Sequence, residues 1–267
     1  MDELLVSVVM PAHNAEKYIQ RAIESVFAQQ GDFQIELFVI DDASEDNTEK
    51  IVKDCVQGQR EKQGDNAIFG KKILTELIYL KNEHNLGVAE TRNRGIREAS
   101  GGYIAFLDAD DWWMPQKLAC QLQLMQQKEA VLSATARELM RQDGTSAGKV
   151  IAIPEKITYR MLLRTNSIPC SSVLMKTEAA REFYMSHDEL HEDYILWLKV
   201  LKKYGEAYGI DEPFLKCRLS EGGKSRNKLK SAKMQFGVYR HMGFGFWRSV
   251  FYFLFYAVNG MKKYSRK

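Results

Sequence analysis

Three carboxylates lie within four positions of this chain, at Asp108, Asp110 and Asp111, directly after the apolar run 103–107. That run has the length and the aromatic and β-branched content of a buried strand. If the chain stays extended, Asp108 and Asp110 project to the same side. Clustered carboxylates repel one another unless a cation or hydrogen-bond donors compensate them, and Mg²⁺ typically binds one or two carboxylates plus substrate phosphates. The cluster therefore predicts a metal site or, alternatively, an N-cap for a helix beginning near Pro115.

Polar turns of the same kind follow other apolar runs in the first half of the chain. Strand-like runs alternate there with helical stripes, which predicts an α/β fold with a parallel sheet and right-handed crossovers. The turns that carry Pro11, Asp42 and Asp108 should then all lie at the carboxyl edge of the sheet, where ligands bind in such folds. The predicted strands are 5–10, 35–40, 73–80 and 103–107, and the predicted helices between them begin near 19, 51 and 88.

The second half of the chain has a mixed pattern. His191-Glu192-Asp193 opens an amphipathic helix that runs to Tyr204. As first-turn acids, Glu192 and Asp193 are favoured by the helix dipole alone, so a catalytic role needs further support. The segment 57–72 is polar and without periodicity, which predicts a surface insertion. The remaining expectations are helices at 117–127 and 159–164, two strands around the turn 142–145, and a strand at 171–176.

Composition sets broad limits on the class of protein. A chain of 267 residues with 45% hydrophobic content can bury a full core, as one large domain or as one domain with an appendage. The four cysteines form no Cys-x-x-Cys pair, which favours reduced thiols in a cytosolic protein. Asp2 and Glu3 stand where a secretion signal would carry cations, so we expect a cytoplasmic location.

The C-terminal segment has a distinct charge and aromatic content. From Lys216 onward, thirteen Lys and Arg stand against Glu221 alone, a balance of +12 that leaves −9 for residues 1–215. The run 244–258 is rich in aromatic residues but is shorter than the roughly 20 apolar residues that span a bilayer. Flanking cations predict that 236–267 includes a helix lying in the interface of an anionic membrane, with no nucleic-acid partner. Packing on the body of the protein or in a homodimer is the alternative.

Five motifs occur in an order that resembles glycosyltransferase family 2, the inverting nucleotide-sugar transferases of the GT-A fold. The likeness covers residues 5–220, and the last fifty residues look like the tails of bacterial members that build surface polysaccharides. It implies a catalytic domain at 1–220, with a nucleotide-sugar half at 1–115 and an acceptor half at 116–220, and a membrane-interface tail at 221–267. The motifs are Val-Val-Met-Pro-Ala-His-Asn at 8–14, Asp-Asp-Ala-Ser at 41–44, Asn-Leu-Gly at 85–87 with Arg92-Asn93, Asp-Ala-Asp-Asp at 108–111, and Glu192-Asp193.

The resemblance implies a role for each matching position. The donor would be a UDP-sugar, and the acceptor a lipid-linked saccharide or a lipopolysaccharide. Asp110 would bind Mn²⁺ or Mg²⁺ at the diphosphate, and Asp193, next to Glu192, would be the catalytic base. The donor positions would be Pro11, Ala12 and Glu16 at the uracil pocket, Asp42 at the uracil ring nitrogen, Asn85 and Arg92 at the base and its pyrophosphate side, and Asp108 with Ala109 at the ribose.

Elementary chemistry supports the same division of roles. Breaking a sugar–phosphate bond leaves charge on a diphosphate, which a bound metal stabilises. The attacking hydroxyl is a poor nucleophile near neutral pH, so a carboxylate must take its proton. A single displacement inverts the anomeric centre, whereas a retaining hydrolase would need a carboxylate nucleophile. One departure from the family is Arg218-Leu219-Ser220, where relatives often carry Arg-x-His and the His assists the metal.

Three other functions remain as alternatives. A sugar nucleotidyltransferase usually has a glycine-rich, cation-bearing phosphate loop after its first strand, and the segment 11–14 is not such a loop. A peripheral membrane protein that binds nucleotides without transferase activity would bind UDP but not hydrolyse UDP-sugars. A dinucleotide oxidoreductase is disfavoured because no Gly-x-Gly-x-x-Gly follows the first strand. The favoured expectation is a transferase on the inner face of the plasma membrane.

Overall fold

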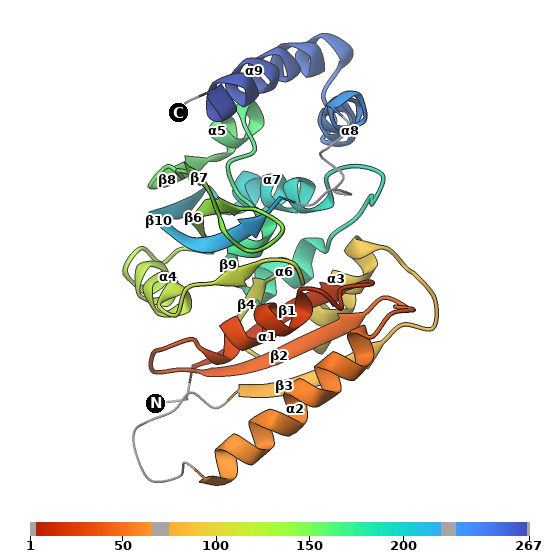
Figure 1. The fold of residues 1–267 in the computed structure, drawn as a ribbon. Coiled ribbons are helices and arrows are strands. Elements are labelled where there is room, and N and C mark those ends of the chain that lie inside the picture. Colours follow the sequence, from red (N-terminus) through yellow and green to blue (C-terminus); the bar gives the residue numbers. More distant parts are fainter. Residues whose placement is uncertain (1–3, 66–74, 220–227, 266–267) are drawn as a thin grey trace.

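The computed structural model describes residues 4–65, 75–219 and 228–265 (Figure 1). The strands are β1 (Leu5–Ala12), β2 (Gln34–Asp41), β3 (Thr75–Lys81), β4 (Tyr103–Phe106), β5 (Trp112–Trp113), β6 (Leu132–Met140), β7 (Ser146–Ile151), β8 (Lys156–Thr158), β9 (Leu174–Lys176) and β10 (Glu206–Arg218). The helices are α1 (Ile19–Phe27), α2 (Thr48–Asp65), α3 (Val88–Glu98), α4 (Lys117–Gln127), α5 (Tyr159–Arg164), α6 (Thr177–Phe183), α7 (Glu192–Tyr204), α8 (Lys228–His241) and α9 (Phe246–Ser265).

All these strands belong to one mixed sheet, in the order β3-β2-β1-β4-β9-β6-β10-β5, with β7 beside β6 and β8 beside β10. β3, β2, β1 and β4 are mutually parallel, as the alternating strand and helix pattern predicts. β9 runs antiparallel to both β4 and β6, so it joins the parallel part to the second half of the sheet. The parallel strands therefore end at a common edge, and the predicted α/β class is confirmed.

Helices cover both faces of the sheet because the strands are apolar on both sides. Along β1, Val8 and Met10 belong to one core cluster, whereas Val9 between them belongs to the other. Residues of α1, α2 and α4 pack into the first cluster, and residues of α3, α6 and α7 pack into the second. A strand that is buried on both faces has a continuous apolar sequence, which is why the first strands could be predicted from the sequence.

Two segments differ from the sequence-based expectation. Part of the predicted insertion at 57–72 belongs to α2, which continues to Asp65, and the rest of it lies outside the described residues. Its Gln, Lys and Glu residues favour a helix by propensity although they form no apolar stripe. The predicted strand 171–176 is a 3₁₀ turn at Cys170–Ser172 followed by the short β9.

The C-terminal helices lie against the second half of the molecule (Figure 1). α8 is anchored there, because Val238 and Tyr239 are fully buried and the Tyr239 hydroxyl donates to the Leu163 carbonyl oxygen at 2.8 Å. α9 packs along α5, where Asn259 Nδ2 donates to the Arg164 carbonyl oxygen at 3.1 Å. Across the described ranges, no helix combines the length and the apolar character needed to span a bilayer.

Candidate active site

A cavity of about 940 Å³ opens at the carboxyl edge of the parallel strands. Seven separate stretches of the chain supply its walls, and the turns after β1, β2 and β4 meet there because these strands are parallel. The lining residues are Pro11, Ala12, His13, Asn14, Ala15, Tyr18, Asp42, Asn85, Gly87, Val88, Thr91, Arg92, Asp108, Ala109, Asp110, Asp111, Pro169, Cys170, Ser171, Asp188, His191, Glu192, Asp193 and Cys217.

The acidic cluster forms a turn, so the expectation of an extended chain at these positions is wrong. β4 ends at Phe106, and the amide of Asp111 donates to the Asp108 carbonyl oxygen at 3.0 Å. The turn nevertheless brings Asp108, Asp110 and Asp111 to the cavity. The capping alternative is also wrong, because α4 has Gln116 at its N-cap and no side-chain cap there.

The three carboxylates differ in their partners. Asp108 Oδ1 accepts from Arg92 Nη2 at 2.6 Å, and Asp111 Oδ1 accepts from the amide of Arg218 at 2.8 Å. Asp110 has no ion pair with a cation of the described residues. Burial, and then the charge of Asp108, raise the pKa of Asp110 to about 6. Burial raises the pKa of Asp111 as well, but Asp111 has the Arg218 amide as a donor, whereas the Asp110 carboxylate has no hydrogen-bond or ion-pair partner among the other described residues and is therefore the candidate to bind an external cation.

A metal fits this turn only if the substrate completes its coordination. Within the described ranges, no group of three or more His, Cys, Asp and Glu side chains is arranged to hold a metal ion. A single carboxylate that shares an ion with phosphate oxygens is, however, a common mode for Mg²⁺. Arg218 lies close by, since its Nε donates to the Asp110 carbonyl oxygen at 3.0 Å and its guanidinium stacks 4.3 Å from the centre of the Tyr18 ring.

Asp193 faces the same cavity from the first turn of α7. Its side chain is partly exposed, and its Oδ1 accepts from the amide of Tyr194 at 2.7 Å. Burial, and then the charge of Glu192, raise the pKa of Asp193 to about 7. A carboxylate with a pKa near neutrality can take and release a proton, so a purely helix-capping role does not account for this environment.

Arg92 joins the two acidic regions of the site. Its side chain is 5% exposed and lies between Asp108 and Glu192, with Nη1 donating to Glu192 Oε1 at 2.9 Å. α3 therefore connects the turn after β4 with the first turn of α7. The resemblance places Arg92 beside the base and pyrophosphate, but two of its donors are already used by carboxylates.

Asp42 is buried at the end of β2 and organises the loop that follows β3. Its Oδ1 accepts from Asn82 Nδ2 and from the amide of Leu86, both at 2.8 Å, and its Oδ2 accepts from the amide of Gly87 at 3.0 Å. A carboxylate has about four acceptor positions, so one remains toward the cavity. Asn85 in this loop lines the cavity, and its Nδ2 lies 3.4 Å from a ring nitrogen of His13.

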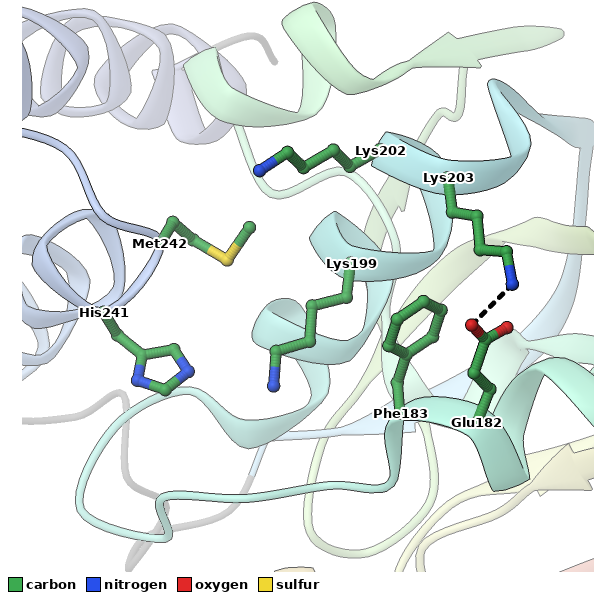
Figure 2. Close-up of a pocket in the computed structure, with 7 residues that line it drawn as sticks. All are labelled: Glu182, Phe183, Lys199, Lys202, Lys203, His241 and Met242. Atoms are coloured by element: carbon green, nitrogen blue, oxygen red, sulfur yellow. Dashed lines mark hydrogen bonds and ion pairs between the residues drawn. The ribbon is translucent and has the colours of Figure 1, made fainter.

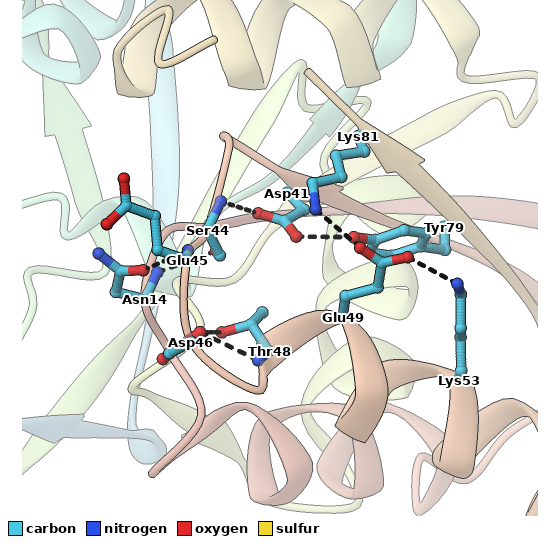
Figure 3. A network of polar contacts seen from close by, with 10 residues as sticks. All are labelled: Asn14, Asp41, Ser44, Glu45, Asp46, Thr48, Glu49, Lys53, Tyr79 and Lys81. Atoms are coloured by element: carbon cyan, nitrogen blue, oxygen red, sulfur yellow. Dashed lines mark hydrogen bonds and ion pairs between the residues drawn. The ribbon is translucent and has the colours of Figure 1, made fainter. Parts of the chain in front are cut away.

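The turn after β2 is held by a second network of polar contacts (Figure 3). Asp41 belongs to this network and is not among the residues that line the cavity. Asp41 accepts from the amide of Ser44 at 2.8 Å and from the Tyr79 hydroxyl at 2.6 Å. Asn14 Oδ1 accepts from the amide of Glu45 at 2.9 Å, which ties the turn after β1 to the turn after β2. These bonds fix the relative positions of the strand ends that line the cavity.

Pro11, Ala12 and Ala109 line the cavity as the sequence predicts, whereas Glu16 is not among the lining residues. Glu16 Oε2 instead accepts from the amide and the side chain of Asn47, at 3.1 and 2.9 Å. Several lining residues carry no motif that sequence reasoning could use. One is Asp188, whose Oδ1 accepts from the amide of Ala89 at 2.9 Å and so holds the start of α3 from 99 positions away.

Comparison with known proteins agrees with this geometry. The model of "Glycosyl transferase family 2" matches residues 7–182. The chain is 36% identical to the putative teichuronic acid biosynthesis glycosyltransferase TuaG of Bacillus subtilis, over 97% of both chains. It is also 36% identical to the UDP-Glc:alpha-D-GlcNAc-diphosphoundecaprenol beta-1,3-glucosyltransferase WfgD of Escherichia coli, over 99% of this chain and 97% of that one.

Solved structures show the same fold at lower identity. The S. aureus TarS 1–349 crystal structure in complex with UDP-GlcNAc superimposes with a TM-score of 0.67 at 20% identity. The match covers 89% of this chain and 65% of that chain, so the likeness concerns the fold and less than two thirds of the solved protein. With the family model spanning well over half of the sequence, the chain belongs to glycosyltransferase family 2.

Proposed function

We propose that this protein is an inverting, metal-dependent glycosyltransferase that moves a sugar from a UDP-sugar to a hydroxyl of a lipid-linked saccharide or a lipopolysaccharide. The observation that carries the proposal is that Asp110 and Asp193, from separate elements, face one cavity and both have raised pKa values. The names of TuaG and WfgD refer to teichuronic acid and to a diphosphoundecaprenol-linked saccharide, which supports a role in surface polysaccharide biosynthesis.

In this proposal Asp193 takes the proton from the acceptor hydroxyl as that oxygen attacks the anomeric carbon. The bond between that carbon and the diphosphate breaks on the opposite face, so the configuration inverts and UDP leaves. Asp110 would hold Mn²⁺ or Mg²⁺, which would supply a Lewis acid for the charge that develops on the leaving diphosphate. Asp42, Asn85 and Asp108 line the same cavity, which supports assigning them to the uracil and the ribose.

The division of the chain follows from the same proposal. Residues 1–115 supply the turns assigned to the donor, and residues 116–220 supply α7 with the base. Residues 221–267 form the tail, whose helix α9 exposes large apolar side chains. We propose that this face contacts the anionic inner leaflet of the plasma membrane, so that the enzyme is peripheral and cytoplasmic. The exposed residues are Phe246, Trp247, Phe251, Leu254, Phe255 and Val258.

The central experiment replaces Asp193 by Asn and compares it with Glu178→Gln. Glu178 is also a first-turn acid, in α6, but it is exposed and lies outside the cavity. Asp193→Asn should bind UDP as the parent does, in calorimetry with Mn²⁺, and lose about 10²- to 10⁴-fold in turnover. Glu178→Gln should keep both. Turnover of Asp193→Asn close to that of the parent, for whichever UDP-sugar of a panel is hydrolysed, would refute the base assignment.

A further inference from the structure

A second cavity, of about 620 Å³, lies between α6, α7 and the end of α8 (Figure 2). It shares no lining residue with the active-site cavity. The loop between α6 and α7 separates the two cavities. Asp188 and His191 in that loop line the active site, whereas the His187 ring lies 4.3 Å, centre to centre, from the tilted ring of His241 at the second cavity. The lining residues are Glu182, Phe183, Lys199, Lys202, Lys203, His241 and Met242.

The second cavity has an excess of unpaired positive charge. Its one carboxylate, Glu182, pairs with Lys203 at 2.5 Å and accepts from the Tyr204 hydroxyl at 2.8 Å. In Figure 2 Lys203 turns toward Glu182, whereas the ammonium groups of Lys199 and Lys202 reach into the space toward α8. No acid in the described part of the chain forms an ion pair with Lys199 or Lys202.

The helix dipole explains only part of this arrangement. Cations are favoured in the last turn of a helix, which accounts for Lys202 and Lys203 at the end of α7. Lys199 lies one turn earlier, and its side chain is partly buried. Burial lowers the pKa of Lys199, so its charge loses hydration without gaining a carboxylate from the described residues. A partly buried cation without a paired acid is an arrangement that a bound anion would stabilise.

The ring of His241 completes the opposite wall. Burial, and then the charges of His187 and Lys199, lower the pKa of His241, while Glu189 opposes them. His187 Nδ1 lies 2.6 Å from Glu189 Oε1, so the acid nearest to these rings already has a partner. The titratable side chains that face the cavity from α7 and α8 are therefore cationic or neutral. The cationic side chains repel one another when no anion is bound.

The cavity also has an apolar component and lies close to the exposed apolar face of α9. Phe183 and Met242 supply part of its wall. Phe246 is only four positions after Met242, and Trp247 next to it is 81% exposed. Four residues reach at most about 14 Å, so a ligand in this cavity would lie close to whatever α9 contacts. Cations beside an apolar surface suit the phosphate end of an amphiphile.

We propose that the cavity lined by Lys199, Lys202 and His241 binds a phosphate group carried by a membrane amphiphile. Two molecules offer that chemistry: an anionic phospholipid headgroup, and the diphosphate of a lipid-linked saccharide. The second source rests on the function proposed above. The diphosphate of a lipid-linked saccharide is consistent with the position of Asp193, the proposed base. Asp193 is six residues before Lys199 on α7, which corresponds to about 9 Å along the helix axis.

Binding is tested with inorganic pyrophosphate in metal-free buffer at fixed pH, followed through the histidine ring signals in NMR spectra. His241 and His187 report on this cavity, and His13 reports on the active site. The ring signals of His241 and His187 should shift saturably. The double variant Lys199→Gln/Lys202→Gln should bind at least about tenfold more weakly, equivalent to about 1.4 kcal/mol.

The matched control is Lys50→Gln/Lys53→Gln, which removes the same charge from exposed positions of α2. It should bind pyrophosphate as the parent does. A shift confined to His13, or equal weakening in both double variants, would overturn the site. Because the assay contains no sugar nucleotide and measures no turnover, its result does not depend on whether Asp193 is the base.

Vesicles then distinguish the two sources. Phosphatidylcholine vesicles carry either phosphatidylglycerol or a polyprenyl diphosphate, and sedimentation measures bound protein. If Lys199→Gln/Lys202→Gln binds phosphatidylglycerol vesicles more weakly than the control variant does, the ligand is the phospholipid headgroup. If binding is weaker only on the polyprenyl diphosphate vesicles, the ligand is the diphosphate of the acceptor. Equal binding of the two double variants to both vesicles would refute the proposal.

Discussion

The guanidinium of Arg92 donates to the Glu192 carboxylate at 2.9 Å, across 100 positions of sequence, and both side chains are buried. The same guanidinium donates to Asp108 at 2.6 Å. One side chain therefore fixes the turn after β4 relative to the first turn of α7. In the proposed mechanism, Arg92 therefore fixes the distance between the residues that bind the sugar nucleotide and the base Asp193. Correct orientation of reacting groups accounts for a large part of catalysis.

Replacing Arg92 by Met should destabilise the protein by about 3–5 kcal/mol, because it leaves two carboxylates facing each other without a cation. Chemical denaturation measures the loss. The double variant Arg92→Met/Glu192→Gln should recover part of it, since Gln carries no charge. If the double variant loses as much free energy of unfolding as the two single variants together, Arg92 and Glu192 are not coupled and their contact does not stabilise the fold.

The activity should depend on pH through Asp193. Its pKa is raised to about 7 by burial and by Glu192, and a general base must be ionised to accept a proton. kcat/KM should therefore rise tenfold per pH unit below about 7 and level off above it, where an ordinary aspartate would already be ionised near pH 4. Rates of transfer measured with the metal concentration held constant test this. A profile that is flat through pH 7 would contradict the assignment.

The same shift predicts that Asp193 lowers the stability of the fold. A carboxyl with a pKa raised on folding binds protons more tightly in the folded state, so stability falls as pH rises from about 4 to about 7 and stays low above that. Asp193→Asn should therefore be more stable than the parent above pH 7, by about 1–3 kcal/mol, and equally stable below pH 4. Thermal unfolding across this range measures the difference, and a constant difference at all pH values would contradict it.

The sequence was sufficient for the elements that local patterns determine. β1, β2 and β4 are buried on both faces and appear as continuous apolar runs, and the carboxyl-edge rule then brings Pro11, Asp42 and Asp108 to one cavity. α7 could be predicted from Glu192 to Tyr204 because its apolar stripe and its first-turn acids both indicate a helix over these residues. Where several local signals agreed, the structure followed them.

Contacts between distant segments left no comparable signal. Nothing near Asp188 indicates that it holds the start of α3, and nothing near Arg92 reveals its pairing with Glu192. These features depend on which elements pack together, and a single sequence does not encode that in any local period.

Removing the carboxylate of Asp110 should abolish the dependence of UDP binding on metal. Asp110 is the acid of the turn whose carboxylate has neither an ion pair nor a hydrogen bond from another described residue, so its loss removes the proposed protein ligand. Calorimetry with UDP, with and without Mn²⁺ or Mg²⁺, compares Asp110→Ala with Asp54→Ala on the exposed side of α2. If Mn²⁺ strengthens UDP binding to the same degree in both variants, Asp110 is not the ligand.

The membrane contact of the tail should depend on α9 and not on α8. Deleting 236–267 would remove the fully buried Val238 and Tyr239 and would unfold the second half of the molecule, so that truncation cannot isolate the tail. Substituting exposed aromatics avoids this difficulty. Trp247→Ser/Phe251→Ser removes apolar area that faces solvent, at 81% and 51% exposure, and should leave the fold intact.

That double variant should sediment less with phosphatidylglycerol vesicles than the parent does, because interfacial binding grows with buried apolar area. The control is Met114→Ser/Val150→Ser, which removes exposed apolar groups that belong to neither α9 nor the helix α5 beside it, and should not change sedimentation. Unchanged sedimentation of Trp247→Ser/Phe251→Ser, together with loss of a dimer in light scattering, would instead assign the exposed face of α9 to contact between two copies of the chain.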